Sequence, residues 1–169
     1  MNQPIFLIGF MGSGKTTLGK ALAQKLEVPF YDLDEEIEKQ SGLRIKELFE
    51  QKGEPYFRSV ENQCLKAFEN IPAPYVLATG GGTPCFFEAM EWMMRKGKVI
   101  FLDPPFETLV ERIQKTGVSR PVFLAHQNGE GKDSLHQLYL QRRKIYLQAA
   151  SRLDSSTIHV NEVIHMLKN

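Results

Sequence analysis

The sequence predicts an α/β fold in which one parallel sheet is covered by helices. Short apolar runs alternate along the chain with segments of helical periodicity, as expected when a crossover helix follows each strand. The first run, residues 5–8 (IFLI), is continuously apolar, which is typical of a strand buried on both faces. A length of 169 residues suits one domain with its own core, so we expect residues 1–169 to form a single unit.

The individual elements follow from the same patterns. Strands are expected at residues 5–8, 30–31, 75–78, 99–102 and 157–160. A first helix is expected after Gly14, where Leu18, Leu22 and Leu26 recur every four residues and form one apolar face. Further helices are expected at residues 35–41, 45–52, 54–70, 84–96, 106–114, 135–152 and 161–168. Residues 115–134 contain three glycines and little periodicity, which predicts a long loop that is either disordered or a functional lid.

Composition excludes several classes of protein. The 21 basic and 20 acidic residues give a net charge of +1, which argues against a general nucleic-acid clamp. The two cysteines form no Cys-x-x-Cys pair and no disulfide framework, which favours a reducing compartment. The first residues, MNQPIFLIGF, lack a basic region and a long apolar run, so neither a signal peptide nor a membrane span is expected. We therefore expect a soluble cytoplasmic protein.

A phosphate-binding loop is the clearest motif. Residues 9–16, GFMGSGKT, fit G-x-x-x-x-G-K-[ST] and lie between the first strand and the first helix. Backbone N–H groups of such a loop and of the helix N-terminus bind phosphate oxygens. Lys15 would reach the β- and γ-phosphates, and the Thr16 hydroxyl would ligate Mg²⁺. The motif predicts a nucleoside triphosphate, and the lack of Asn-Lys-x-Asp and Leu-Ser-Gly-Gly sequences argues against GTPases and transporter ATPases.

Carboxylates follow two of the predicted strands. Asp32 and Asp34 could have different roles, one supporting hydrated Mg²⁺ and the other accepting a proton from an attacking hydroxyl. Alternatively, Asp34 caps the helix that follows. Asp103 also ends an apolar strand, but Pro104 and Pro105 come next, so we expect it to make a local turn bond and assign the metal to Asp32.

Two further features suit an anionic acceptor. Arg58 follows a glycine-bearing break beside Phe57, and a fixed guanidinium can bind a carboxylate in a bidentate manner, although isolated arginines are usually surface residues. Residues 80–82 (GGG) follow a predicted strand and form either a flexible turn or a backbone segment that approaches a ligand. The four histidines have no metal-ligand spacing, so no zinc site is expected.

Taken together, these motifs resemble the shikimate kinase family from Ile5 to about Ala150. The segments are, in order, GFMGSGKTTLGKALA, DLDEEIE, GLRIKELFEQKGEPYFRSVE, ATGGG, FLDPPFETLVERI, SRPV and RRKIYLQAA. The resemblance implies a P-loop NTPase-type three-layer sandwich with a five-stranded parallel sheet of order 2-3-1-4-5 and a mobile lid. It implies ATP- and Mg²⁺-dependent phosphorylation of the 3-hydroxyl of shikimate, a step toward chorismate and aromatic amino acids.

The resemblance also assigns roles to individual residues. The ATP phosphates are expected to be bound by Gly12, Ser13, Gly14, Lys15, Thr16, Thr17 and the lid residue Arg120. The metal is expected on Thr16 and, through water, on Asp32. Shikimate is expected to contact Asp34, Arg58, Gly80, Gly81, Gly82 and Arg142. Asp34 would accept the proton, with Lys15 and Arg120 as the other catalytic residues.

Some assignments depart from the family pattern or leave a choice. Arg142 is preferred to Arg143 because its spacing to Tyr146 fits Arg-x-x-x-Tyr, and Arg112 is the candidate for stacking on adenine. The lid reads Arg-Pro-Val-Phe from Arg120, where the family commonly has Arg-Pro-Leu-Leu.

Two rival hypotheses for the function are another small-molecule kinase, of the gluconate or nucleoside monophosphate type, and a non-enzymatic nucleotide-binding module. We expect a monomer.

Overall fold

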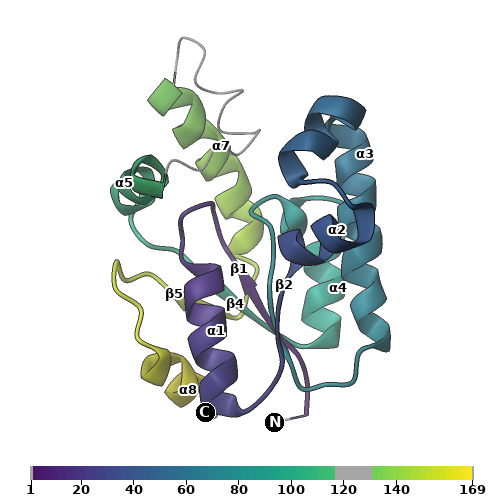
Figure 1. Ribbon diagram of the computed structural model, residues 1–169. Helices are drawn as coiled ribbons and strands as arrows, with labels where there is room; N and C mark the ends of the chain where they lie inside the picture. The colour runs from purple at the N-terminus through teal and green to yellow at the C-terminus, as the bar shows by residue number, and fades with distance from the viewer. Residues whose placement is uncertain (1, 117–130, 169) are drawn as a thin grey trace.

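The computed structural model describes residues 2–116 and 131–168. Its strands form one parallel sheet in the order β2-β3-β1-β4-β5, which confirms the predicted fold class and strand order (Figure 1). The strands are β1 Ile5–Ile8, β2 Phe30–Asp32, β3 Val76–Ala78, β4 Lys98–Leu102 and β5 Ser151–Leu153. Because all strands are parallel, their carboxyl ends meet at one edge of the sheet.

Helices cover both faces of the sheet. The α-helices are α1 Lys15–Leu26, α2 Leu33–Ser41, α3 Ile45–Ala67, α4 Ala89–Lys96, α5 Phe106–Thr116, α7 Gly131–Tyr146 and α8 Val160–Lys168. Short 3₁₀ turns occur at Phe68–Asn70 and Thr83–Cys85. In the part of the chain that the structure describes, no helix is long and apolar enough to span a bilayer.

The central strand β1 explains the two-sided core. Phe6 and Ile8 pack into a cluster with residues of α2, α3, α4, α5 and α7, whereas Ile5 and Leu7 pack into a second cluster with α1 and α8. Successive strand residues point to opposite faces, so a strand buried on both faces must be continuously apolar. All four residues are buried, as the sequence predicted.

Two glycines and a proline shape the helical regions near the site. Helix α3 runs through the break expected at Gly53, whose φ of 81° is non-helical, and Pro55 follows in the next turn. Gly42 ends α2 with a left-handed φ of 69°, which turns the chain into α3. The predicted helix at 84–96 is a 3₁₀ turn followed by α4.

The last strand was assigned wrongly from the sequence. The predicted strand at 157–160 is not formed, and the predicted helix at 135–152 ends at Tyr146. Instead β5 pairs with β4 in the register Ile100↔Ser151, Phe101↔Arg152 and Leu102↔Leu153. This strand is too short and polar to show a period, so its pairing with β4 decides its structure.

The predicted loop at 115–134 is only partly described. Lys115 and Thr116 belong to α5, and residues 131–134 form the first turn of α7. Residues 117–130, which include Arg120 and most of the expected lid, lie outside the described residues.

Candidate active site

A cavity of about 630 Å³ opens at the carboxyl edge of the sheet. Its walls include the phosphate loop, Asp32 at the end of β2, Asp34 in the first turn of α2, and Arg112 from α5. In parallel α/β sheets this edge is where ligands bind. The cavity therefore brings together two motifs that lie sixteen or more residues apart in the sequence.

Left-handed glycines and the start of α1 shape the phosphate loop. Gly12 has φ 78° and Gly14 has φ 95°, values that L side chains rarely adopt. The buried Lys15 folds back over the loop, and its Nζ donates to the carbonyl oxygens of Gly9 at 2.8 Å and Phe10 at 3.0 Å. The ammonium group is thus held beside the N-terminus of α1, the end of a helix that favours anions.

Thr16 and Asp32 join the loop to the end of β2. The Thr16 hydroxyl donates to Oδ2 of Asp32 at 2.6 Å. Asp32 is also the N-cap of α2, since its Oδ1 accepts from the backbone N–H of Asp34 at 3.1 Å. The capping role considered for Asp34 therefore belongs to Asp32, because α2 begins at Leu33 and places Asp34 inside its first turn.

Arg58 is buried, with a relative exposure of 5%, and its orientation is set by two carboxylates. Its Nη1 donates to Glu61 at 2.8 Å, while Nε and Nη2 both donate to Oε1 of Glu54 at 3.1 and 3.0 Å. Glu61 is buried as well and accepts from the Thr83 hydroxyl at 2.7 Å. The guanidinium lies 4.5 Å from the ring centre of Phe86. These contacts fix the plane of the guanidinium, as bidentate recognition requires.

In the run of three glycines at 80–82, the first and the last lie directly against charged side chains. A Cβ atom on Gly80 would lie 2.8 Å from Oε1 of Glu61 and 3.1 Å from Oδ1 of Asp34. A Cβ atom on Gly82 would lie 2.5 Å from Nη1 of Arg58. The segment is therefore a close approach of backbone to charged groups, and two of its positions have no room for a side chain.

Arg142 extends from α7 toward the middle glycine. Its Nη1 lies 3.7 Å from the position of a Cβ on Gly81, and its guanidinium lies 5.9 Å from the ring centre of Phe10. Arg143 instead binds Asp103, so the two neighbouring arginines serve different parts of the molecule. Tyr146, one turn after Arg142, donates from its hydroxyl to the carbonyl of Gly81, and burial raises the pKa of this phenol.

The remaining predicted residues are placed as follows. Arg112 donates to the carbonyl oxygens of Gly12 at 3.2 Å and Ser156 at 2.6 Å, at the wall of the cavity. Asp103 makes long-range contacts and not the expected local turn bond.

Sequence reasoning missed the roles of Glu54 and Glu61, although their i,i+4 and i,i+3 spacing to Arg58 was a usable signal.

The residues of the site could hold a magnesium ion. Across residues 2–116 and 131–168, no group of three or more His, Cys, Asp or Glu side chains could hold a metal. Mg²⁺, however, is usually held by one or two carboxylates, waters and the phosphates of its substrate. The hydroxyl of Thr16 and the carboxylate of Asp32 are hard oxygen ligands beside the phosphate loop, so they fit that requirement.

A phosphate-loop motif between β1 and α1, with two buried arginines beside the Gly80–Gly82 turn, is the arrangement expected of P-loop kinases that act on small molecules. Similarity to known proteins narrows this class. The model of the shikimate kinase family matches residues 11–168. The chain therefore belongs to the shikimate kinase family and is an enzyme of that type.

Individual relatives agree with this assignment. A shikimate kinase of Aquifex aeolicus is 43% identical over 148 residues, covering 86% of this chain and 82% of the relative. The crystal structure of the Bacteroides thetaiotaomicron shikimate kinase superposes with a TM-score of 0.90 at 36% identity and covers both chains completely. The Acinetobacter baumannii enzyme, solved in complex with shikimate, has a TM-score of 0.87 at 31% identity and covers 99% of this chain and 92% of that one.

Proposed function

We propose that the chain transfers the γ-phosphoryl group of ATP to the 3-hydroxyl of shikimate and uses the acceptor residues described above. The observation that carries this proposal is the row of charged groups along Gly80–Gly82, where Asp34, Arg142 and Arg58 lie beside successive glycines. One carboxylate and two guanidinium groups around a single turn complement a small ligand that carries hydroxyl groups and a carboxylate.

ATP would bind with its phosphates on the loop of residues 12–17. The backbone N–H groups of the loop and of the first turn of α1 would receive the phosphate oxygens. Lys15 would exchange its present carbonyl partners, on Gly9 and Phe10, for oxygens of the β- and γ-phosphates. Arg120, which lies outside the described residues, is proposed as a further phosphate ligand.

Magnesium would be held by Thr16 directly and by Asp32 through water. When bound, the ion neutralises the charge that develops on the phosphate oxygens. The hydrogen bond between Thr16 and Asp32 orients both oxygens before nucleotide arrives.

Shikimate would bind with its carboxylate between Arg58 and Arg142 and its hydroxyls toward Asp34. Asp34 would orient the 3-hydroxyl and accept its proton as the bond from O3 to the γ-phosphorus forms and the bond to the β,γ-bridging oxygen breaks. The products are shikimate 3-phosphate and ADP, so charge and atoms balance without a further reactant.

The test is ADP formation in a coupled assay with shikimate, gluconate and nucleoside monophosphates as acceptors. We expect turnover with shikimate alone, abolished in Lys15→Ala. The matched control is Lys39→Ala, which removes an exposed lysine that pairs with Glu36 on the surface of α2. Comparable turnover with gluconate or a nucleoside monophosphate would contradict the proposed acceptor.

A further inference from the structure

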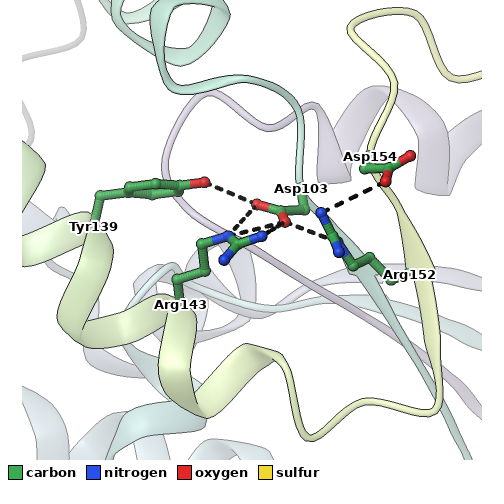
Figure 2. Close-up of polar contacts among 5 residues, drawn as sticks. All are labelled: Asp103, Tyr139, Arg143, Arg152 and Asp154. Carbon is green, nitrogen blue, oxygen red and sulfur yellow. Dashed lines mark hydrogen bonds and ion pairs between the residues drawn. The ribbon is translucent and has the colours of Figure 1, made fainter.

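The buried carboxylate of Asp103, outside the acceptor and nucleotide sites, is the centre of a network of polar side chains. It follows the last residue of β4, and only 2% of its side chain is exposed. It accepts hydrogen bonds from the Tyr139 hydroxyl at 2.9 Å, from Nη2 of Arg143 at 2.8 Å and from Nε of Arg152 at 2.9 Å (Figure 2). Nε of Arg143 contacts both of its oxygens, at 3.1 and 3.0 Å.

These contacts connect three elements that are distant in the sequence. Asp103 follows β4, Tyr139 and Arg143 lie one turn apart on α7, and Arg152 lies in β5. A buried carboxylate is costly unless it is paired and hydrogen-bonded, and here two guanidinium groups and a phenol satisfy it. Burial and the hydrogen bond to Asp103 raise the pKa of Tyr139 to about 12, so the phenol stays a donor at neutral pH.

The partners on α7 also set the direction of Arg142. Consecutive helix residues are about 100° apart around the axis, so a helix that keeps Arg143 on Asp103 turns Arg142 to a different side. That side faces Gly81 and Phe10. The ring of Tyr139 packs edge-on against Phe10 at 5.5 Å, which ties the same turn of α7 to the phosphate loop.

We infer that Asp103 is a positioning residue for shikimate binding: it fixes the rotation of α7 through Tyr139 and Arg143 so that Arg142 is held beside Gly81. This inference rests on the proposed role of Arg142 in binding the substrate carboxylate. It concerns the acceptor, because the polar contacts of Asp103 run to α7 and β5, and the arginine that they orient lies beside Gly81.

The first test is Asp103→Asn, which keeps the shape and one acceptor but removes the charge that pairs with both arginines. We expect the KM for shikimate to rise about tenfold, the size expected when a charge-assisted contact is weakened, with the KM for ATP within about twofold of wild type. The control is Asp154→Asn, which removes the exposed outer partner of Arg152 at 3.5 Å and should leave both KM values unchanged.

A double-mutant cycle separates positioning from general loss of stability. In the Asp103→Asn background, Arg142→Lys should raise the shikimate KM by a smaller factor than it does in the wild type, because the arginine is already misplaced. If Asp103→Asn does not fold, Arg143→Gln and Tyr139→Phe provide the same test, since each removes only one partner of the carboxylate.

The outcomes are distinguishable. A shikimate KM within twofold of wild type in the folded variants of Asp103, Tyr139 and Arg143 overturns the inference, and so do KM values for ATP and shikimate that rise together. If Arg142→Lys itself binds shikimate as the wild type does, the proposed clamp fails, and this inference fails with it. If Arg142→Lys is impaired while the network variants are normal, only this inference fails.

Discussion

Gly82 lies so close to Arg58 that a Cβ atom on the glycine would be 2.5 Å from Nη1 and 2.6 Å from Cζ of the guanidinium. The backbone of Gly82 is unstrained, with φ −91°, so the requirement for glycine comes from space and not from conformation. Arg58 cannot easily retreat, because Glu54 and Glu61 hold its three nitrogens.

This contact predicts that Gly82→Ala will displace Arg58 and raise the KM for shikimate at least tenfold, as the loss of a charge-assisted contact would. The control is Glu91→Ala, which removes an exposed side chain that pairs with Arg95 on the surface of α4. Steady-state kinetics on both variants measure the difference. Equal KM values for the two variants would contradict the steric argument.

Replacing either acceptor arginine by lysine should weaken shikimate binding and leave ATP binding almost unchanged. Lysine keeps the charge of Arg58 or Arg142 but loses the planar fork that matches a carboxylate. We expect a loss of about 10–100-fold in affinity for each variant, measured by calorimetric titration. Arg95→Lys is the control, since Arg95 is exposed and pairs with Glu91 on the surface of α4. Unchanged shikimate affinity in both acceptor variants would remove the proposed clamp.

Asp34→Asn should lower kcat by about 10²–10⁴-fold while the protein remains folded. Asparagine can still hydrogen-bond the 3-hydroxyl but cannot accept its proton. The neighbouring Glu35→Gln, which removes a charge from the same turn of α2, serves as the control for electrostatic changes. A kcat for Asp34→Asn close to that of the wild type would exclude Asp34 as the base.

Asp32→Asn should raise the Mg²⁺ concentration needed for half-maximal activity without unfolding α2. Asparagine is as good an N-cap as aspartate, so the cap that Asp32 provides to the N–H of Asp34 is retained. The charge that would attract the metal beside Thr16 is lost. A magnesium titration at saturating ATP and shikimate measures the shift, and circular dichroism checks the helix. An unchanged magnesium requirement would show that Asp32 does not support the ion.

Cys64 should resist alkylation in the folded protein. Burial first, and then the nearby carboxylates of Glu36 and Glu61, raise the pKa of this thiol from 9.0 to about 11. At pH 8 the reactive thiolate is therefore about 100-fold scarcer than in the unfolded chain. Mass spectrometry after iodoacetamide treatment, with and without denaturant, measures the protection. Equal labelling of Cys64 in both conditions would contradict its burial.

The same shifts determine how stability depends on alkaline pH. Cys64, and Tyr75 with a pKa raised from 10.0 to about 12 mainly by burial, hold their protons more tightly when folded. Their contribution to stability is complete below pH 9 and is lost as the pH rises toward 11 to 12, because the unfolded chain ionises first. Denaturant unfolding at pH 8 and pH 10.5 should show a lower free energy of unfolding at the higher pH.

The sequence alone predicts the structural and chemical features that depend on residues close together in the chain. Three features each lie within a short segment: the four apolar residues of β1, the glycines and lysine of the phosphate loop, and the two aspartates at the junction of β2 and α2. The glycine break in α3 was also predictable, since Gly53 adopts a conformation that other residues avoid. The order of these motifs was enough to predict the family and the strand order.

Tertiary structure decided the features that depend on partners far along the chain. Ser151–Leu153 forms a strand because it pairs with β4 at the edge of the sheet. Its three residues are too few to show a hydrophobic period of their own. Asp103 has partners 36 to 49 positions away, and these contacts direct Arg143 to one side of α7 and Arg142 to the other. Such contacts form between segments that meet only after the sheet has assembled, so no spacing within the sequence reveals them.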